Sequence, residues 1–102
     1  MSDPDARRVT VRQALLEELL DGPATARDLS RLVGIPERDV AEHLSHLERS
    51  VRGHGQRLVI EPPVCLTCDF VFTHRGPHRY TRPGRCPECH GRRITLPVFR
   101  VE

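Results

Sequence analysis

Four cysteines in two close pairs constrain this chain more than any other feature of its sequence. Cys65 and Cys68 form the first pair, Cys86 and Cys89 form the second, and 17 residues separate the two pairs. Two residues between paired cysteines allow one tight turn to point both sulfur atoms at the same place, and this spacing is typical of zinc sites. The sequence therefore predicts one structural Zn²⁺ ion per chain, bound by all four thiolates.

Three other interpretations of these residues are weighed against the zinc site. An iron ion accepts the same four ligands in a rubredoxin-like site. Redox-active cysteines also occur as C-x2-C pairs, but in a βαβ context that the pattern here does not provide. His90 follows the second pair directly and is a further candidate ligand. Four thiolates already complete a tetrahedral shell with no open position, so we expect a structural ion and not a catalytic one.

The start of the chain bears on the compartment. Residues 1–15 contain five charged side chains and no apolar run. No stretch of the chain reaches the ~20 apolar residues that a membrane span needs. We therefore expect a cytoplasmic protein without a membrane partner. In that compartment paired cysteines favour metal binding over disulfides.

Capping signals divide residues 10–52 into three expected helices, and residues 1–9 are interpreted as a polar leader ahead of them. Side chains that cap helix N-termini and glycines that end helices mark the boundaries. An apolar residue at every third or fourth position gives each helix one face for a small core. The helices are expected to start at Thr10, Thr25 and Pro36, and the first two to end at Gly22 and Gly34.

A turn with two glycines and a short strand follow the third helix. Residues 58–60 are all branched and apolar, and Pro62 and Pro63 end the strand. Three short helices with a glycine turn between the second and the third, followed by such a strand, describe a winged helix-turn-helix.

Two further strands are expected around the cysteine pairs, at residues 70–72 and 94–101, with a polar loop at residues 74–85 between them. Together these elements predict an α+β fold in two parts. The predicted parts are a winged helix-turn-helix domain at residues 1–61 and a β-rich zinc-ribbon domain at residues 62–102.

Residues 57–62, both cysteine pairs and residues 99–101 carry a resemblance to a known family. Through these segments, RLVIEP and FRV outside the cysteines, the chain resembles small prokaryotic predicted transcriptional regulators that fuse a winged helix-turn-helix to a zinc ribbon. The resemblance covers nearly the whole chain and implies DNA binding and a regulatory role. The helical half also resembles arsenic-repressor-like winged helices through residues 40–47, but departs at Ala41, where a serine commonly meets the DNA.

The third helix is the expected reader of DNA, because a recognition helix presents its N-terminal residues to base edges. Residues 37–49 carry four acids and two arginines, a balance of −2, so phosphate contacts are expected mainly from arginines outside that helix. All 16 basic residues are arginine, which suits bidentate phosphate contact. The candidate DNA contacts are Arg38, Glu42, His43, His46, Arg49, Arg52, Arg57, Arg75, Arg79 and Arg82.

These features favour a DNA-binding transcriptional regulator whose partner is double-stranded DNA. The alternative is an adaptor that docks on RNA polymerase or another transcription factor, through the ribbon or the acidic third helix. Arginines that share the exposed face of the third helix favour the first function, and arginines opposed to it favour the second. Leu16 and Leu20 leave apolar surface on the first helix for a homodimer. No enzyme is expected, because the chain has no lysine, P-loop or G-x-S-x-G motif.

Overall fold

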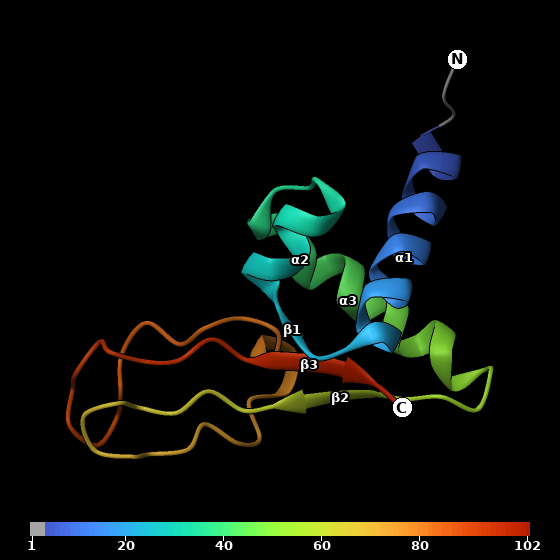
Figure 1. Cartoon of the computed structure of the whole chain (residues 1–102). Helices are drawn as coiled ribbons and strands as arrows, with labels where there is room; N and C mark the ends of the chain where they lie inside the picture. The colour runs from blue at the N-terminus through green and yellow to red at the C-terminus, as the bar shows by residue number, and fades with distance from the viewer. Residues whose placement is uncertain (1–3) are drawn as a thin grey trace.

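The computed structural model describes residues 4–102, with side chains described from Thr10 onward. Three helices lie on one side of a three-stranded sheet, and a long loop hairpin between the last two strands extends beyond the end of the sheet (Figure 1). No helix in the described part of the chain is both long and apolar enough to cross a membrane. The elements are α1 (Pro4–Asp21), β1 (Ala24–Thr25), α2 (Ala26–Val33), α3 (Glu37–Arg52), β2 (Leu58–Glu61), the 3-10 turn η1 (Gly76–His78) and β3 (Val98–Val101).

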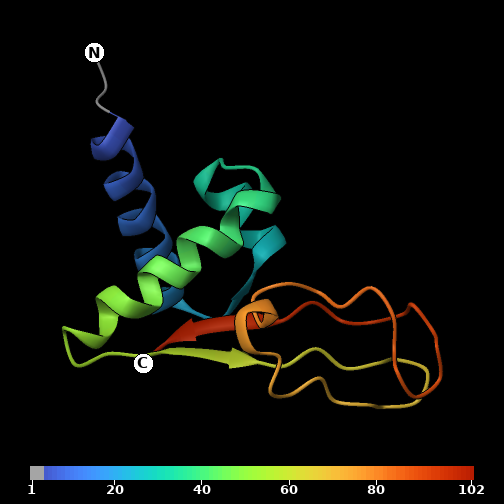
Figure 2. The same cartoon turned by 180° about the vertical axis from the view of Figure 1, so that it is seen from behind.

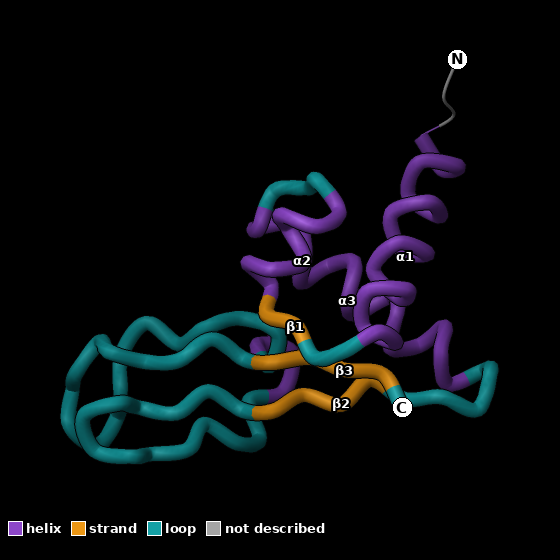
Figure 3. Tube along the Cα trace, viewed as in Figure 1, coloured by secondary structure: helices purple, strands orange, loops and turns teal. Residues whose placement is uncertain are grey.

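The sheet joins a short strand that follows α1 to two strands from the second half of the chain. Its order is β1-β3-β2, and both pairings are antiparallel. The central strand β3 places Phe99 opposite Ala24 on one side and opposite Ile60 on the other. Figure 3 shows the hairpin leaving the sheet through β2 and returning through β3. The expected division between residues 61 and 62 therefore separates strands that the sheet joins, and β1 was not expected from the sequence.

The second helix has the ends that the sequence predicts. The Thr25 hydroxyl accepts from the Asp28 amide at 3.1 Å, and the Asp28 carboxylate accepts from the Thr25 amide at 3.0 Å. This capping box lowers the pKa of Asp28, chiefly through the hydrogen bond from the Thr25 backbone. Gly34 ends the helix at φ 79° and ψ 35°, a left-handed conformation that glycine adopts without strain. The third helix begins directly after Pro36, as predicted.

The first helix begins earlier than the sequence predicted. Helix α1 starts at Pro4, so Thr10 lies inside it and is not its N-cap. Proline suits the first turn of a helix, where its missing N–H would have no partner, and residues 5–9 contain no glycine or proline to stop the helix. The expected leader is therefore helical from residue 4, and residues 1–3 lie outside the described residues.

Two clusters of buried side chains hold the fold together. The smaller one surrounds the cysteines and includes Phe72 and Ile94, with Phe70 packed edge-on against Phe72 at 5.0 Å between ring centroids. The larger one is shared by the three helices and the sheet. Its members are Leu15, Leu19, Ala24, Leu29, Val40, Leu44, Leu47, Val51, Leu58, Tyr80, Phe99 and Val101.

The expected strand at residues 70–72 is present only as one isolated bridge, between Val64 and Val71. Two bonds make this bridge: the Cys65 amide donates to the Phe70 carbonyl at 2.9 Å, and the Phe72 amide donates to the Pro63 carbonyl at 3.0 Å. Pro63 has no N–H with which to return a bond to Phe72, and the Cys65 carbonyl accepts from the Asp69 amide of the cysteine turn, so pairing does not extend along this segment.

Candidate metal centre and arginine surface

The two cysteine pairs have the same backbone geometry. The Asp69 amide donates to the Cys65 carbonyl and the His90 amide donates to the Cys86 carbonyl, each at 2.9 Å. Asp69 and His90, which directly follow the second cysteine of each pair, adopt φ values of 65° and 63°. Glycine is common at that left-handed position, but aspartate and histidine also tolerate it. The two turns are therefore related copies that point their sulfur atoms inward.

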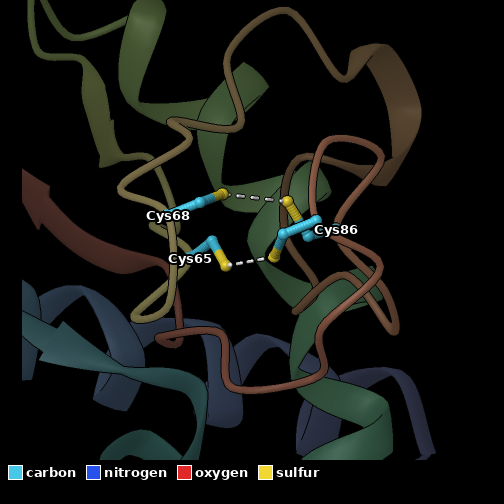
Figure 4. A group of neighbouring side chains, drawn as sticks. Cys65, Cys68 and Cys86 are labelled. Atoms are coloured by element: carbon cyan, nitrogen blue, oxygen red, sulfur yellow. Dashed lines mark hydrogen bonds between the residues drawn. The ribbon is translucent and has the colours of Figure 1, made fainter.

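All four sulfur atoms lie within 4.8 Å of one another. The Cys65 and Cys89 sulfurs are 3.5 Å apart, and the Cys68 and Cys86 sulfurs are 3.6 Å apart (Figure 4). A disulfide needs about 2.05 Å, whereas a tetrahedral ion with metal–sulfur bonds of about 2.3 Å spaces its sulfurs about 3.8 Å apart. The group can therefore hold a metal ion. Among the described residues His90 is not part of it.

The pKa of the Cys65 thiol is lowered, whereas burial and the neighbouring thiols raise the pKa of Cys68 and Cys89. Cys65 and Cys86 are fully buried, while Cys68 is exposed. The Cys68 backbone N–H lowers the pKa of Cys65 to about 6, so that this thiol is ionised at neutral pH. The Gly91 amide also lies 3.4 Å from the Cys89 sulfur. Thiolates are the form that binds metal, and backbone N–H groups directed at Cys65 and Cys89 act toward that form.

The arms that carry the two cysteine pairs are tied to each other. The Leu66 amide donates to the Arg93 carbonyl at 2.7 Å, and the Thr95 amide donates to the Val64 carbonyl at 3.0 Å. The Val64 amide in turn donates to the Thr95 hydroxyl at 2.8 Å. These bonds continue toward β2 and β3, so the cysteine hairpin (residues 62–97) is joined to the sheet by a continuous series of backbone contacts.

A buried carboxylate on α3 links the helix to the cysteine hairpin. Glu48 is only 7% exposed, and its carboxylate accepts from Arg79 at 2.7 Å and from the Tyr80 hydroxyl at 3.1 Å. The Tyr80 ring stacks on Phe99 of β3 at 6.5 Å between centroids. The segment around η1, orange in Figure 2, thereby folds back to the sheet. Sequence reasoning missed this cluster, because its members are 31 and 32 residues apart and no local pattern marks them.

Several of the predicted DNA contacts share one face of α3. Arg38, Glu42, Arg49 and Arg52 are all exposed, and their spacing of three, four and seven residues puts them on one stripe of the helix. A hollow of about 430 Å³ runs beside this stripe toward the segment that carries Arg79.

Three other predicted DNA contacts are engaged inside the molecule. Arg79 is held on Glu48, as described above. Arg57 pairs with the Glu102 carboxylate at the C-terminal end, and the Arg75 guanidinium donates to the Thr81 carbonyl. Arg82 is exposed and lines a second hollow together with Arg38. The loop arginines that looked equivalent in sequence are therefore not equivalent in the fold.

The predicted histidine contacts lie on the other flank of α3. His43 and His46 are half-buried and line a hollow with Arg12 of α1. Burial, and then the neighbouring Arg12 charge, lower the pKa of His43. The His43 Nδ1 and Arg12 Nε atoms are buried without a hydrogen-bond partner among the described residues. His43 therefore lies between two helices in surroundings that favour its neutral form.

The fold and the site define a class: a small α+β protein of three helices and a three-stranded sheet that carries a four-cysteine hairpin. A family model described as PF0610-like, N-terminal, matches residues 10–59. The solution structure of protein PF0610 from Pyrococcus furiosus is similar over 92% of this chain and 90% of that chain, with 30% sequence identity and a TM-score of 0.78. The chain therefore belongs to the PF0610-like family. No curated protein matches it.

Proposed function

We propose that this chain is a DNA-binding transcriptional regulator, in which α2 and α3 act as a winged helix-turn-helix and the cysteine hairpin holds one structural zinc ion. The observation that carries the proposal is the position of the arginines. Arg38, Arg49 and Arg52 share the exposed face of α3, and Arg82 of the hairpin lies beside its first turns. Arginines on the face of the recognition helix are what phosphate contact requires.

The charge that α3 presents in the folded chain supports DNA binding better than the balance of −2 counted along residues 37–49. Two of its four acids are compensated by arginines from elsewhere in the chain. Glu48 pairs with Arg79 at 2.7 Å, and Glu37 lies 3.8 Å from Arg27. What α3 presents on the exposed stripe is then Arg38, Arg49 and Arg52 against Glu42, with Arg52 also 3.9 Å from Glu48, and this surface is basic.

The helix-turn-helix geometry has support in the turn between α2 and α3. Gly34 in its left-handed conformation redirects the chain within three residues, and α3 begins at Glu37. Such a short turn sets two helices at a steep angle and leaves the second one exposed along one side. The hairpin after β2 occupies the place of a wing, with Arg82 as its contribution to a phosphate-binding surface.

Zinc is the proposed metal because four thiolates, sulfur separations near 3.6 Å and a closed shell match a structural zinc site. The ion then has no open position for chemistry. Its part is to hold the hairpin that carries Arg82 and to keep β2 and β3 paired at the base.

An adaptor that docks on RNA polymerase or another transcription factor is the second candidate. The observation in its favour is apolar surface on the hairpin, where Leu66 is 58% and Val71 is 45% exposed. Exposed apolar side chains of this size are typical of contacts with other proteins. This candidate predicts that substitutions of Leu66 or Val71 on the hairpin impair function, whereas substitutions in the arginine stripe of α3 do not.

A salt titration on random-sequence duplex DNA distinguishes the two. Each phosphate contact contributes about −0.9 to the slope of log affinity against log salt. The Arg38→Ala/Arg49→Ala variant is expected to weaken binding and flatten that slope by about two units. Arg100→Ala, an exposed arginine of β3 between the buried Phe99 and Val101, is the matched control and should leave both unchanged. Absence of duplex binding at low salt would favour the adaptor.

A further inference from the structure

A hollow between α3 and the cysteine hairpin has the composition of a small-ligand site. Its volume is about 320 Å³, near the lower end of ligand pockets. Half-buried apolar side chains line it from three separate parts of the chain, namely Ala26, Ala41 and Leu96. Such a concave apolar surface, formed by segments far apart in sequence, is available only in the folded protein.

Two guanidinium groups at this hollow have no internal partner. Neither the Arg38 nor the Arg82 side chain makes a hydrogen bond or ion pair with any other described residue, and both are exposed. The acid that lines the same hollow, Glu37, is 3.8 Å from Arg27 and so is compensated from the other side. The hollow therefore carries two positive charges that the chain itself does not neutralise.

We propose that this hollow binds a small organic anion, one phosphate or carboxylate group on a compact apolar body. Arg38 and Arg82 would hold the anionic group, since guanidinium groups bind such groups through paired hydrogen bonds. The apolar body would cover Ala41 and Leu96. A phosphate of the DNA backbone would use the arginines but leave that apolar surface bare, so the lining favours the small molecule.

The ligand would also regulate DNA binding, an extension that rests on the proposed function. Arg38 belongs both to this hollow and to the exposed stripe of α3. An anion held by Arg38 removes that guanidinium from phosphate contact, so the ligand and the duplex compete for the same side chain. Occupied protein should bind duplex more weakly than free protein.

Phenyl phosphate is the probe, titrated into the full metal-loaded chain without DNA and followed by amide chemical shifts. Saturable shifts are expected at residues that line the hollow, among them Ala41, Thr81 and Leu96. Inorganic phosphate has the charge without the apolar body, and benzyl alcohol has the apolar body without the charge. Each should bind at least about tenfold more weakly than phenyl phosphate, because each lacks one of two contributions of about 1.4 kcal/mol or more.

Substitutions assign the charge contacts. Arg38→Gln and Arg82→Gln should each weaken phenyl phosphate binding about tenfold, which is the effect of removing one charged hydrogen-bonding partner. Both side chains are exposed, so the variants should keep the parent spectrum elsewhere. Arg100→Gln on β3 is the matched control and should bind like the parent chain.

Two results would overturn the inference: no saturable shift at the hollow, or equal affinity for phenyl phosphate and inorganic phosphate. A final arm repeats the duplex titration with phenyl phosphate present. If phenyl phosphate binds but no duplex does, the proposed DNA-binding function fails while the ligand site stands. If duplex binds and phenyl phosphate does not, the ligand site fails alone.

Discussion

Arg79 of the cysteine hairpin donates to the carboxylate of Glu48 on α3 at 2.7 Å, across 31 residues of sequence. This contact holds the hairpin segment against α3. It also neutralises one of the four acidic side chains of that helix. The Tyr80 hydroxyl completes the cluster at 3.1 Å, and its ring joins the core of the helices.

Removing the buried carboxylate should destabilise the fold. Glu48→Ala leaves the buried Tyr80 hydroxyl without its acceptor, a loss of roughly 1–3 kcal/mol in the free energy of unfolding. Glu42→Ala, an exposed acid of the same helix, should change it by less than about 0.5 kcal/mol. Urea denaturation measures both. Equal effects of the two substitutions would show that the Glu48 cluster contributes nothing specific to stability.

Gly91 should be required for tight metal binding. A Cβ atom there would lie 3.2 Å from the Cys89 sulfur and 3.5 Å from the Thr67 hydroxyl. Gly91→Ala would displace the amide that points at that sulfur, and changes around metal ligands typically lower affinity 10–100-fold. Gly84→Ala is the control, since a Cβ there meets nothing within 4 Å. Competition with a chromophoric chelator compares the two, and matching affinities would contradict the prediction.

Removal of the metal should unfold the hairpin before the helices. Structural zinc sites contribute on the order of 10 kcal/mol to folding. The Leu66 amide donates across the two arms of the hairpin, and the His90 amide donates within the second cysteine turn. Both amides should lose protection from hydrogen exchange on chelation. The amides of Leu44 and Leu47 in α3 should keep it, because their core includes α1 and α2. Loss of helical circular dichroism together with the metal would mean that hairpin and helices fold as one unit.

Two neighbouring arginines of the hairpin should differ in effect. Arg82 is exposed and unpaired among the described residues, so Arg82→Ala should flatten the salt dependence of duplex binding by about 0.9. Arg79 is committed to Glu48, so Arg79→Ala should lower stability and leave the salt slope unchanged. A flattened slope for Arg79→Ala would mean that this guanidinium reaches DNA despite its internal partner.

The capping box of α2 should make stability depend on acid pH. Folding lowers the pKa of Asp28 through its bond to the Thr25 backbone. The stabilisation is therefore complete above the unfolded pKa of about 3.9 and is lost as the pH falls through the lower folded value. Asp28→Asn should lower the melting temperature at pH 6 and show a shallower fall between pH 5 and pH 2 than the parent. Parallel curves for the two proteins would exclude this contribution.

Local signals in the sequence predicted much of the fold correctly. The capping box at Thr25, the glycine end at Gly34 and the start of α3 after Pro36 depend on residues within one helical turn of each other. The prediction from the cysteine spacing likewise rests on two short turns, and in the structure all four sulfur atoms lie within 4.8 Å of one another. Such features need no knowledge of the rest of the chain.

Other features were decided by contacts between distant residues. Strand β1 has only two residues, and it exists because β3 pairs with it from more than seventy residues away. The predicted start of α1 at Thr10 was wrong. A polar segment without a strong stop signal can extend a helix, and helix propensity alone is a weak guide to where the helix begins.

The sequence by itself determined which four cysteines can hold a metal ion, where α2 begins and ends, and that every Lys/Arg position is an arginine. Tertiary structure alone decided which arginines stay free, since Arg57, Arg75 and Arg79 find partners inside the fold whereas Arg38 and Arg82 do not. The physical reason is that a net charge counted along the chain ignores distance. Ion pairing falls off within a few ångströms, and only the folded chain brings those groups together.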